Sequence, residues 1–103
     1  MISVVSPAYN NPDQVARMLD ALREKCGSAG YEVIVVDDGS SHVSIGDVCR
    51  VRAAKYVRLP RNRGACAARN EGARQASGEI ILFLDSDALA RAEQTPGQDR
   101  RPL

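Results

Sequence analysis

Aromatic and histidine residues are scarce in this 103-residue sequence, which has three Tyr, one Phe, one His and no Trp. Four aromatic side chains are too few for the stacking platforms that bind single-stranded nucleic acid. The single histidine, His42, excludes a metal site built on several histidines and disfavours Ser-His-Asp catalysis. The three cysteines are odd in number and lack CxxC spacing, so we expect reduced thiols in a cytoplasmic protein.

The sequence also lacks an excess of charge of one sign and any long hydrophobic run. Lys and Arg number 14 against 13 Asp and Glu, a net charge of +1. This balance gives no field that favours nucleic acid or an anionic membrane as a partner. The longest apolar runs, residues 33–36 and 80–84, fall far short of the roughly 20 residues that a membrane-spanning helix needs. Because no basic segment precedes the first apolar run, we expect no signal peptide.

Short apolar stretches alternate with stretches of helical pattern along the chain. We expect strands at residues 2–6, 31–36, 56–59 and 80–84, with helices over residues 11–26, 43–53 and 64–76. The second and fourth strands are apolar nearly throughout, which is typical of strands buried on both faces of a parallel sheet. This order predicts an α/β fold with a doubly wound, Rossmann-like, mainly parallel sheet.

Local signals define the ends of these elements. Asn11 is the expected N-cap of the first helix, with Gln14 completing a capping box, and Pro7 is expected to end the first strand. Cys66 is expected to be a small core residue of the third helix. We expect one domain over residues 1–90 and a disordered tail over residues 91–103, because the tail has no periodicity and almost no large apolar residue.

Polar side chains follow the end of each predicted strand. They are Tyr9 and Asn10, then Asp37 and Asp38, then Arg61 and Arg63, and finally Asp85 and Asp87. In an open α/β sheet the ligand crevice lies outside the carboxyl ends of the strands, so these groups should converge on one rim.

These polar residues also have interpretations that involve no ligand. Asp85 and Asp87 suit a divalent cation such as Mg²⁺ or Mn²⁺, but the same pair occurs in solvated turns. Asp38 suits a base or ribose, although an Asp-Gly step is an ordinary turn. Arg69 suits a diphosphate or is plain surface charge, and Tyr9 stacks on a base or packs in the core. No GxGxxG or GxxxxGK[ST] is present, which argues against a dinucleotide-binding fold and excludes a P-loop NTPase.

Five motifs in order resemble the N-terminal, nucleotide-binding half of family 2 glycosyltransferases. They are Ser3–Asn10, Glu32–Ser40, Asn62–Gly64, Ala68–Gly72 and Ser77–Asp87, the last ending in a DxD motif. The resemblance covers roughly residues 2–88 and implies a glycosyltransferase A-type fold. It also implies a nucleotide-sugar donor, UDP-sugar in the first place, and inverting transfer to an acceptor hydroxyl with Mn²⁺ or Mg²⁺.

The resemblance assigns roles to particular residues. It implies a nucleotide-binding site of Pro7, Ala8, Tyr9, Asp38, Arg69 and Asp85, with Tyr9 and Asp38 at the base. Asp87 would bind the metal that bridges the diphosphate.

The resemblance stops after the fourth strand. Nothing in residues 88–103 resembles the acceptor-binding half of the family, which carries the general base, so we name no catalytic residue. We therefore expect a truncated fragment, inactive alone, whose exposed sheet edge promotes self-association. Membrane association is left open for a full-length parent, since relatives often carry C-terminal spans. The alternatives are a non-catalytic nucleotide-binding or interaction module that complements a partner chain and, with less support, a nucleotidyltransferase.

Overall fold

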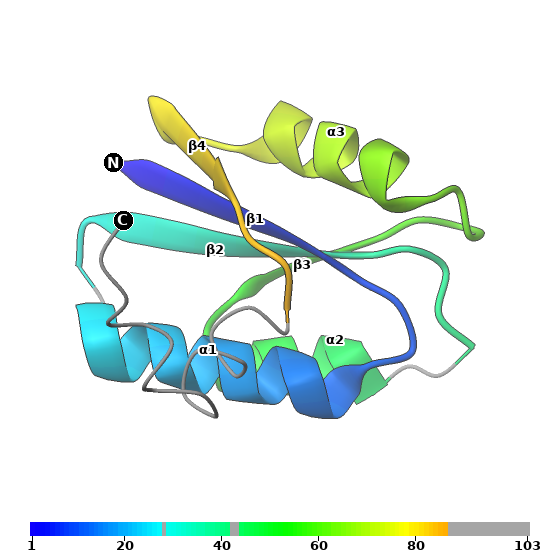
Figure 1. Ribbon diagram of the computed structural model, residues 1–103, viewed down its shortest axis with the longest axis horizontal. Helices are drawn as coiled ribbons and strands as arrows, with labels where there is room; N and C mark the ends of the chain where they lie inside the picture. The colour runs from blue at the N-terminus through cyan, green and yellow to red at the C-terminus, as the bar shows by residue number, and fades with distance from the viewer. Residues whose placement is uncertain (28, 42–43, 87–103) are drawn as a thin grey trace, which may run out of the picture.

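The computed structural model describes residues 1–27, 29–41 and 44–86, which form one sheet and three helices (Figure 1). The elements are β1 (Ile2–Ala8), α1 (Pro12–Cys26), β2 (Tyr31–Asp37), α2 (Ser44–Val51), β3 (Lys55–Arg58), α3 (Ala65–Gln75) and β4 (Ile80–Phe83). All strand pairs are parallel, in the order β3-β2-β1-β4. The predicted α/β fold with a parallel sheet is confirmed. Tail residues 91–103 lie outside the described residues.

The helices form a layer on each side of the sheet, with α1 and α2 on one face and α3 on the other (Figure 1). Alternate residues of β1 serve the two faces, as strand geometry requires. Val4 belongs to the core that α1 and α2 cover, together with Met18 and Ile45. Val5 points to the opposite face and packs in the core that includes Ala68 of α3. The sheet is therefore covered on both sides over its central strands.

Helix α1 begins directly after Asn11, the predicted N-cap position, but the predicted hydrogen bonds of the cap are not made. Asn11 makes no side-chain capping bond to the helix. Its Nδ2 instead donates to Gln14 Oε1 at 3.1 Å and to Ser86 Oγ at 2.7 Å, and its Oδ1 accepts from the Tyr9 amide at 2.9 Å. The predicted capping box is thus wrong, because Asn11 joins the segments that follow β1 and β4.

Strand β1 runs through Pro7 to Ala8, two residues past its predicted end. The Ala8 carbonyl accepts from the Asp38 amide on the β2 side. The nitrogen of Pro7 therefore faces the side of β4, whose pairing with β1 ends at Val5. A missing N–H there removes no ladder hydrogen bond, so proline is tolerated.

Strand β4 is exposed, contrary to the prediction that it is buried. Ile80, Ile81, Leu82 and Phe83 are 61%, 39%, 51% and 47% exposed. It is an edge strand, and within the described residues the helical layers lie over its neighbours (Figure 1). An apolar sequence indicates that a strand favours burial, but it does not determine whether another element packs over that strand.

The cysteines are all free, and Cys66 is exposed rather than part of the core. Helix α3 turns Ala68 and Gly72, four residues apart, towards the sheet. Cys66 lies two positions before Ala68, which places it on the opposite side of the helix. Cys49 is the buried cysteine, and burial raises the pKa of its thiol to about 11.

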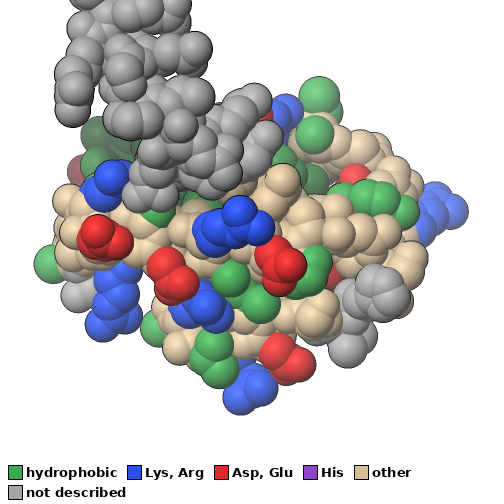
Figure 2. All heavy atoms as spheres, turned by 60° about the horizontal axis from the view of Figure 1, so that its bottom comes forward, with side chains coloured by type: hydrophobic (Ala, Val, Ile, Leu, Met, Phe, Trp, Pro, Cys, Tyr) green, Lys and Arg blue, Asp and Glu red, His purple; other side chains and the backbone are tan. Residues whose placement is uncertain are grey.

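The surface of the α1 and α2 layer carries acidic and basic side chains in a mixed pattern over the described residues (Figure 2). This agrees with the near-neutral net charge of +1. Among the described helices, none has both the length and the apolar character needed to cross a membrane.

Candidate functional site

A shallow hollow of about 330 Å³ lies at the carboxyl ends of the strands. Its lining combines the end of β1 with the loops after β2 and β3, and consists of Pro7, Ala8, Tyr9, Asn11, Asp38, Asn62, Gly64 and Ala65. Four of the residues predicted to bind a nucleotide, Pro7, Ala8, Tyr9 and Asp38, are therefore brought together. Arg69 and Asp85 are not among the lining residues.

Asp38 joins the ends of β2 and β3. Its side chain is buried, and Oδ1 and Oδ2 accept hydrogen bonds of 2.8 Å from the amides of Arg63 and Gly64. Each carboxylate oxygen keeps room for a further donor, since it has two lone pairs. The two backbone amides thus supply the hydrogen bonds that the buried carboxylate needs. Asp38 can still accept a further hydrogen bond from a ligand in the hollow.

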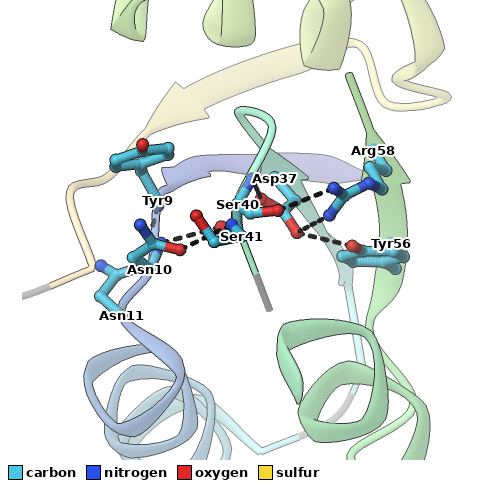
Figure 3. A network of polar contacts seen from close by, with 8 residues as sticks. All are labelled: Tyr9, Asn10, Asn11, Asp37, Ser40, Ser41, Tyr56 and Arg58. Carbon is cyan, nitrogen blue, oxygen red and sulfur yellow. Dashed lines mark hydrogen bonds and ion pairs between the residues drawn. The ribbon is translucent and has the colours of Figure 1, made fainter. Parts of the chain in front are cut away.

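Asp37, the other acidic residue of this turn, is fully buried and belongs to the framework of the rim. Oδ2 accepts from Tyr56 Oη at 2.6 Å and from Arg58 Nη1 at 3.2 Å, and Oδ1 accepts from the Ser40 amide at 2.9 Å. Figure 3 shows Tyr56 and Arg58 directed from β3 towards this carboxylate. Burying two adjacent acids is costly unless hydrogen-bond donors satisfy them, and here neighbouring residues supply those donors.

The same network reaches the turn after β1. The Asn10 amide donates to Ser40 Oγ at 2.8 Å, and Asn10 Oδ1 accepts from the Ser41 amide at 2.9 Å (Figure 3). Asn10 has a φ of +51°, in the left-handed region that asparagine adopts more readily than most residues. These two bonds hold the turn that carries Tyr9.

The surroundings of Tyr56 keep its hydroxyl protonated, so that it remains a hydrogen-bond donor. Burial, and then its hydrogen bond to Asp37, raise the pKa of the Tyr56 hydroxyl. The pKa of Arg58 is also raised, first by its interaction with Tyr56. The buried carboxylate of Asp37 therefore faces a neutral hydroxyl and a permanent cation.

Tyr9 is 47% exposed, so it is no core residue, and it is one of the residues that line the hollow. An exposed ring in this place is suited to stacking on a planar ligand.

Arg69 and Asp85 pair with each other and do not line the hollow. Arg69 Nη2 lies 3.2 Å from Asp85 Oδ1, and the Asp85 side chain is 57% exposed. The described residues contain no group of three or more His, Cys, Asp or Glu side chains placed to hold a metal ion. Asp87, the predicted metal ligand, lies outside the described residues. Asp85 is therefore the described member of the acidic pair expected to meet a cation.

Sequence reasoning missed the roles of both Tyr56 and Arg58. A signal was available, because the two residues are two apart on β3 and so share a face. Arg58 is moreover the register partner of Asp37 on β2. That register could not be read from the sequence alone.

A second and larger hollow, of about 490 Å³, lies at the opposite end of the sheet. Tyr31, Arg52 and Lys55 are among the residues that line it. None of the predicted site residues belongs to it, so this larger hollow and the rim at the carboxyl ends of the strands are separate.

These features define an α/β domain with a candidate ligand site at the carboxyl ends of a parallel sheet. The sequence matches Glycosyl transferase family 2 over residues 3–96, and the chain belongs to this family. Among curated relatives, an uncharacterized glycosyltransferase of Haemophilus influenzae is 36% identical over 87 residues, which are 84% of this chain and 29% of the relative. A poly(ribitol-phosphate) beta-glucosyltransferase of Bacillus spizizenii is 38% identical over 99 residues, 89% of this chain and 16% of the relative.

Solved structures agree with this assignment. Residues 1–349 of S. aureus TarS in complex with UDP match 94% of this chain with a TM-score of 0.72 and 30% identity, covering 32% of that protein chain. Glucosyl-3-phosphoglycerate synthase from Mycobacterium tuberculosis, in complex with Mn²⁺, UDP and glucosyl-3-phosphoglycerate, matches 84% of this chain with a TM-score of 0.65 and 28% identity, covering 33% of that chain. The present chain thus spans about a third or less of the length of these relatives.

Proposed function

We propose that this chain binds the nucleotide of a nucleotide-diphosphate sugar, UDP in the first place, at the hollow beside Tyr9 and Asp38. The observation that carries this proposal is the convergence of Pro7, Ala8, Tyr9 and Asp38 on one hollow in a family 2 chain. The relatives solved with UDP support the choice of nucleotide. The reaction it would serve is inverting glycosyl transfer from the bound donor to an acceptor hydroxyl.

Within this proposal each residue does what its surroundings allow. Tyr9 stacks on the base, since it is exposed and lines the hollow. Asp38 accepts from the base through the lone pairs that the Arg63 and Gly64 amides leave free. Arg69, which pairs with Asp85, compensates negative charge on the ribose and diphosphate side.

Mn²⁺ or Mg²⁺ would be held by Asp87 with Asp85 beside it, an oxygen donor set that such hard cations prefer. The metal would neutralise negative charge on the leaving nucleoside diphosphate. We propose that this rim binds the nucleotide-sugar donor and does not supply the general base that would remove a proton from the acceptor. Its two buried carboxylates serve as hydrogen-bond acceptors, Asp37 for three donors of the chain and Asp38 for two amides and the base.

Calorimetric titration with UDP, with and without Mn²⁺, tests the proposal. We expect binding that strengthens with Mn²⁺ and that Asp87→Asn makes independent of the metal. Tyr9→Ala should weaken binding about tenfold or more, the usual loss of one stacking partner.

Asp47→Asn, on the exposed surface of α2, is the matched control and should bind as the wild type does. A chain that is folded by circular dichroism and binds neither UDP nor GDP would contradict the proposal.

A second candidate function is a nucleotide-binding or interaction module that another polypeptide completes. The exposure of all four β4 residues favours it, because an edge strand with apolar side chains on both faces is suited to a partner strand. The occupant proposed here is the remainder of a family 2 domain, since the matched relatives are at least three times as long as the segment they share with this chain.

A further inference from the structure

Tyr56 and Arg58 lie on β3, at the far edge of the sheet from β4, and do not line the hollow. They are nevertheless bound to the loop that does. Their positions two apart on one strand place both side chains on the same face, where they meet the end of β2.

Arg58 fastens the loop after β2 at two points. Nη1 donates to Asp37 Oδ2 at 3.2 Å, and Nη2 donates to the Ser40 carbonyl at 2.7 Å. Tyr56 Oη donates to the same Asp37 oxygen, while the other oxygen accepts from the Ser40 amide. Ser40 is therefore held at both its amide and its carbonyl, and Asp38 lies within the segment so fixed.

The loop in turn holds the turn that presents Tyr9. Ser40 Oγ accepts from the Asn10 amide, and the Ser41 amide donates to Asn10 Oδ1. Figure 3 shows the contacts running without a break from Arg58 and Tyr56 through Asp37 and Ser40 to Asn10. Asp37 is fully buried, so it is not available to a ligand and acts on the site through these neighbours.

We propose that Tyr56 and Arg58 are positioning residues for nucleotide binding, which act through Asp37 and Ser40 to set the places of Asp38 and Tyr9. This inference rests on the proposed function. A purely structural role, neutralising the buried Asp37, would lower the stability of the fold but leave the affinity of the folded chain unchanged.

Matched variants at the two ends of the sheet separate these roles. Tyr56→Phe removes one hydroxyl donor, and Arg58→Lys replaces the two-point fork with one ammonium that cannot keep both contacts. Tyr31→Phe and Arg52→Lys are the controls. Tyr31 Oη donates to the Gly27 carbonyl, and Arg52 binds both carboxylate oxygens of Asp20, away from the rim.

The measurements are the melting temperature, amide hydrogen exchange at Ser40 and Ser41, and UDP affinity well below the melting temperature. Both β3 variants should speed amide exchange at Ser40 and Ser41 by about tenfold, and they should weaken UDP binding by about the same factor. This is the loss expected when a hydrogen bond to a charged group is removed. The controls should change neither quantity, even where they lower the melting temperature as much.

Unchanged exchange and unchanged UDP affinity in Tyr56→Phe and Arg58→Lys, with only a lower melting temperature, would overturn the inference. If the folded wild type binds no UDP, the proposed function fails instead. Exchange at Ser40 and Ser41 then decides by itself whether β3 fixes the loop.

Discussion

Glu32, near the start of β2, organises the end of the sheet opposite to the candidate site. Its Oε2 accepts from Ser3 Oγ at 2.6 Å and from the Ser77 amide at 2.7 Å, and Ser3 Oγ accepts from the Gly78 amide at 2.8 Å. These bonds, that of Ser3 first, lower the pKa of Glu32 from its ordinary value of 4.5. A single carboxylate thus ties the turn before β4 to the two central strands.

This lowered pKa predicts a pH-dependent share of the stability. A carboxyl whose pKa is lower in the folded chain stabilises it above the unfolded-state pKa. This stabilisation is lost as the pH falls through the folded pKa. We expect the urea midpoint to fall between about pH 5 and pH 3, and to fall less in Glu32→Gln, as followed by circular dichroism.

Glu24→Gln, on the exposed surface of α1, serves as the control and should keep the wild-type profile. An identical pH profile in Glu32→Gln and the wild type would show that this carboxylate contributes nothing to the dependence.

Single residues at the rim could be predicted where they depended on spacing alone. Tyr9, Asp38 and Asp85 each follow a strand, and parallel strands carry such residues to one edge whatever their register. The partner of Asp37 could not be predicted in this way. It depends on which residue of β3 lies opposite the end of β2, and a shift of one position would turn Arg58 to the other face.

Helix α3 approaches the sheet more closely than an ordinary side chain would permit. At Gly72 an added Cβ would lie 2.3 Å from Val5 Cγ1 and 3.1 Å from Val36 Cγ2. The two buried residues of this helix, Ala68 and Gly72, are small and allow this close packing. The same helix carries Arg69, which pairs with Asp85 after β4, so the distance of the helix from the sheet also affects this ion pair.

Gly72→Ala should therefore destabilise the fold. Overpacking typically costs about 1–3 kcal/mol, which exceeds the gain of up to about 1 kcal/mol in helix propensity. Urea denaturation measures the difference.

Gly46→Ala in α2 is the matched control, because its Cβ would come no closer than 3.3 Å to the Tyr56 ring. If Gly72→Ala were as stable as Gly46→Ala, the close approach of α3 to β1 would be disproved.

Elements were predicted best where local chemistry decides them. The stripe of Val15, Met18, Leu19 and Leu22 specifies α1, and all four side chains are buried. The burial of β4 was predicted wrongly because it depends on what covers the strand, and its apolar residues carry no information about that cover. The side-chain capping bond of Asn11 was predicted wrongly for a similar reason, since its side chain bonds instead to Ser86, 75 positions away.

At the scale of the whole molecule, β4 leaves an apolar strand and an unpaired sheet edge on the surface of the described residues. Such an edge pairs readily with another strand. We expect the isolated chain to self-associate with rising concentration, and Leu82→Lys to restore the monomer mass in size-exclusion chromatography with light scattering.

Val51→Lys replaces a side chain that is 68% exposed on α2, away from the sheet edge, and should leave the association unchanged. A wild-type chain that stays monomeric throughout, or two lysine variants with equal effect, would exclude β4 as the contact.

The central place of β1 also governs the order in which the sheet is assembled. β1 is synthesised before the other three strands of this sheet, yet one of its two neighbours is β4, so that Met1 and Glu79 meet across 78 positions of sequence. Contacts this distant are slow to form, because the intervening chain must first be brought together. On the ribosome, β1 would wait with one side unpaired until nearly all the described residues had emerged. Between the synthesis of β1 and that of β4, the unpaired edge of β1 is exposed, and in this interval a chaperone would protect the chain most from aggregation.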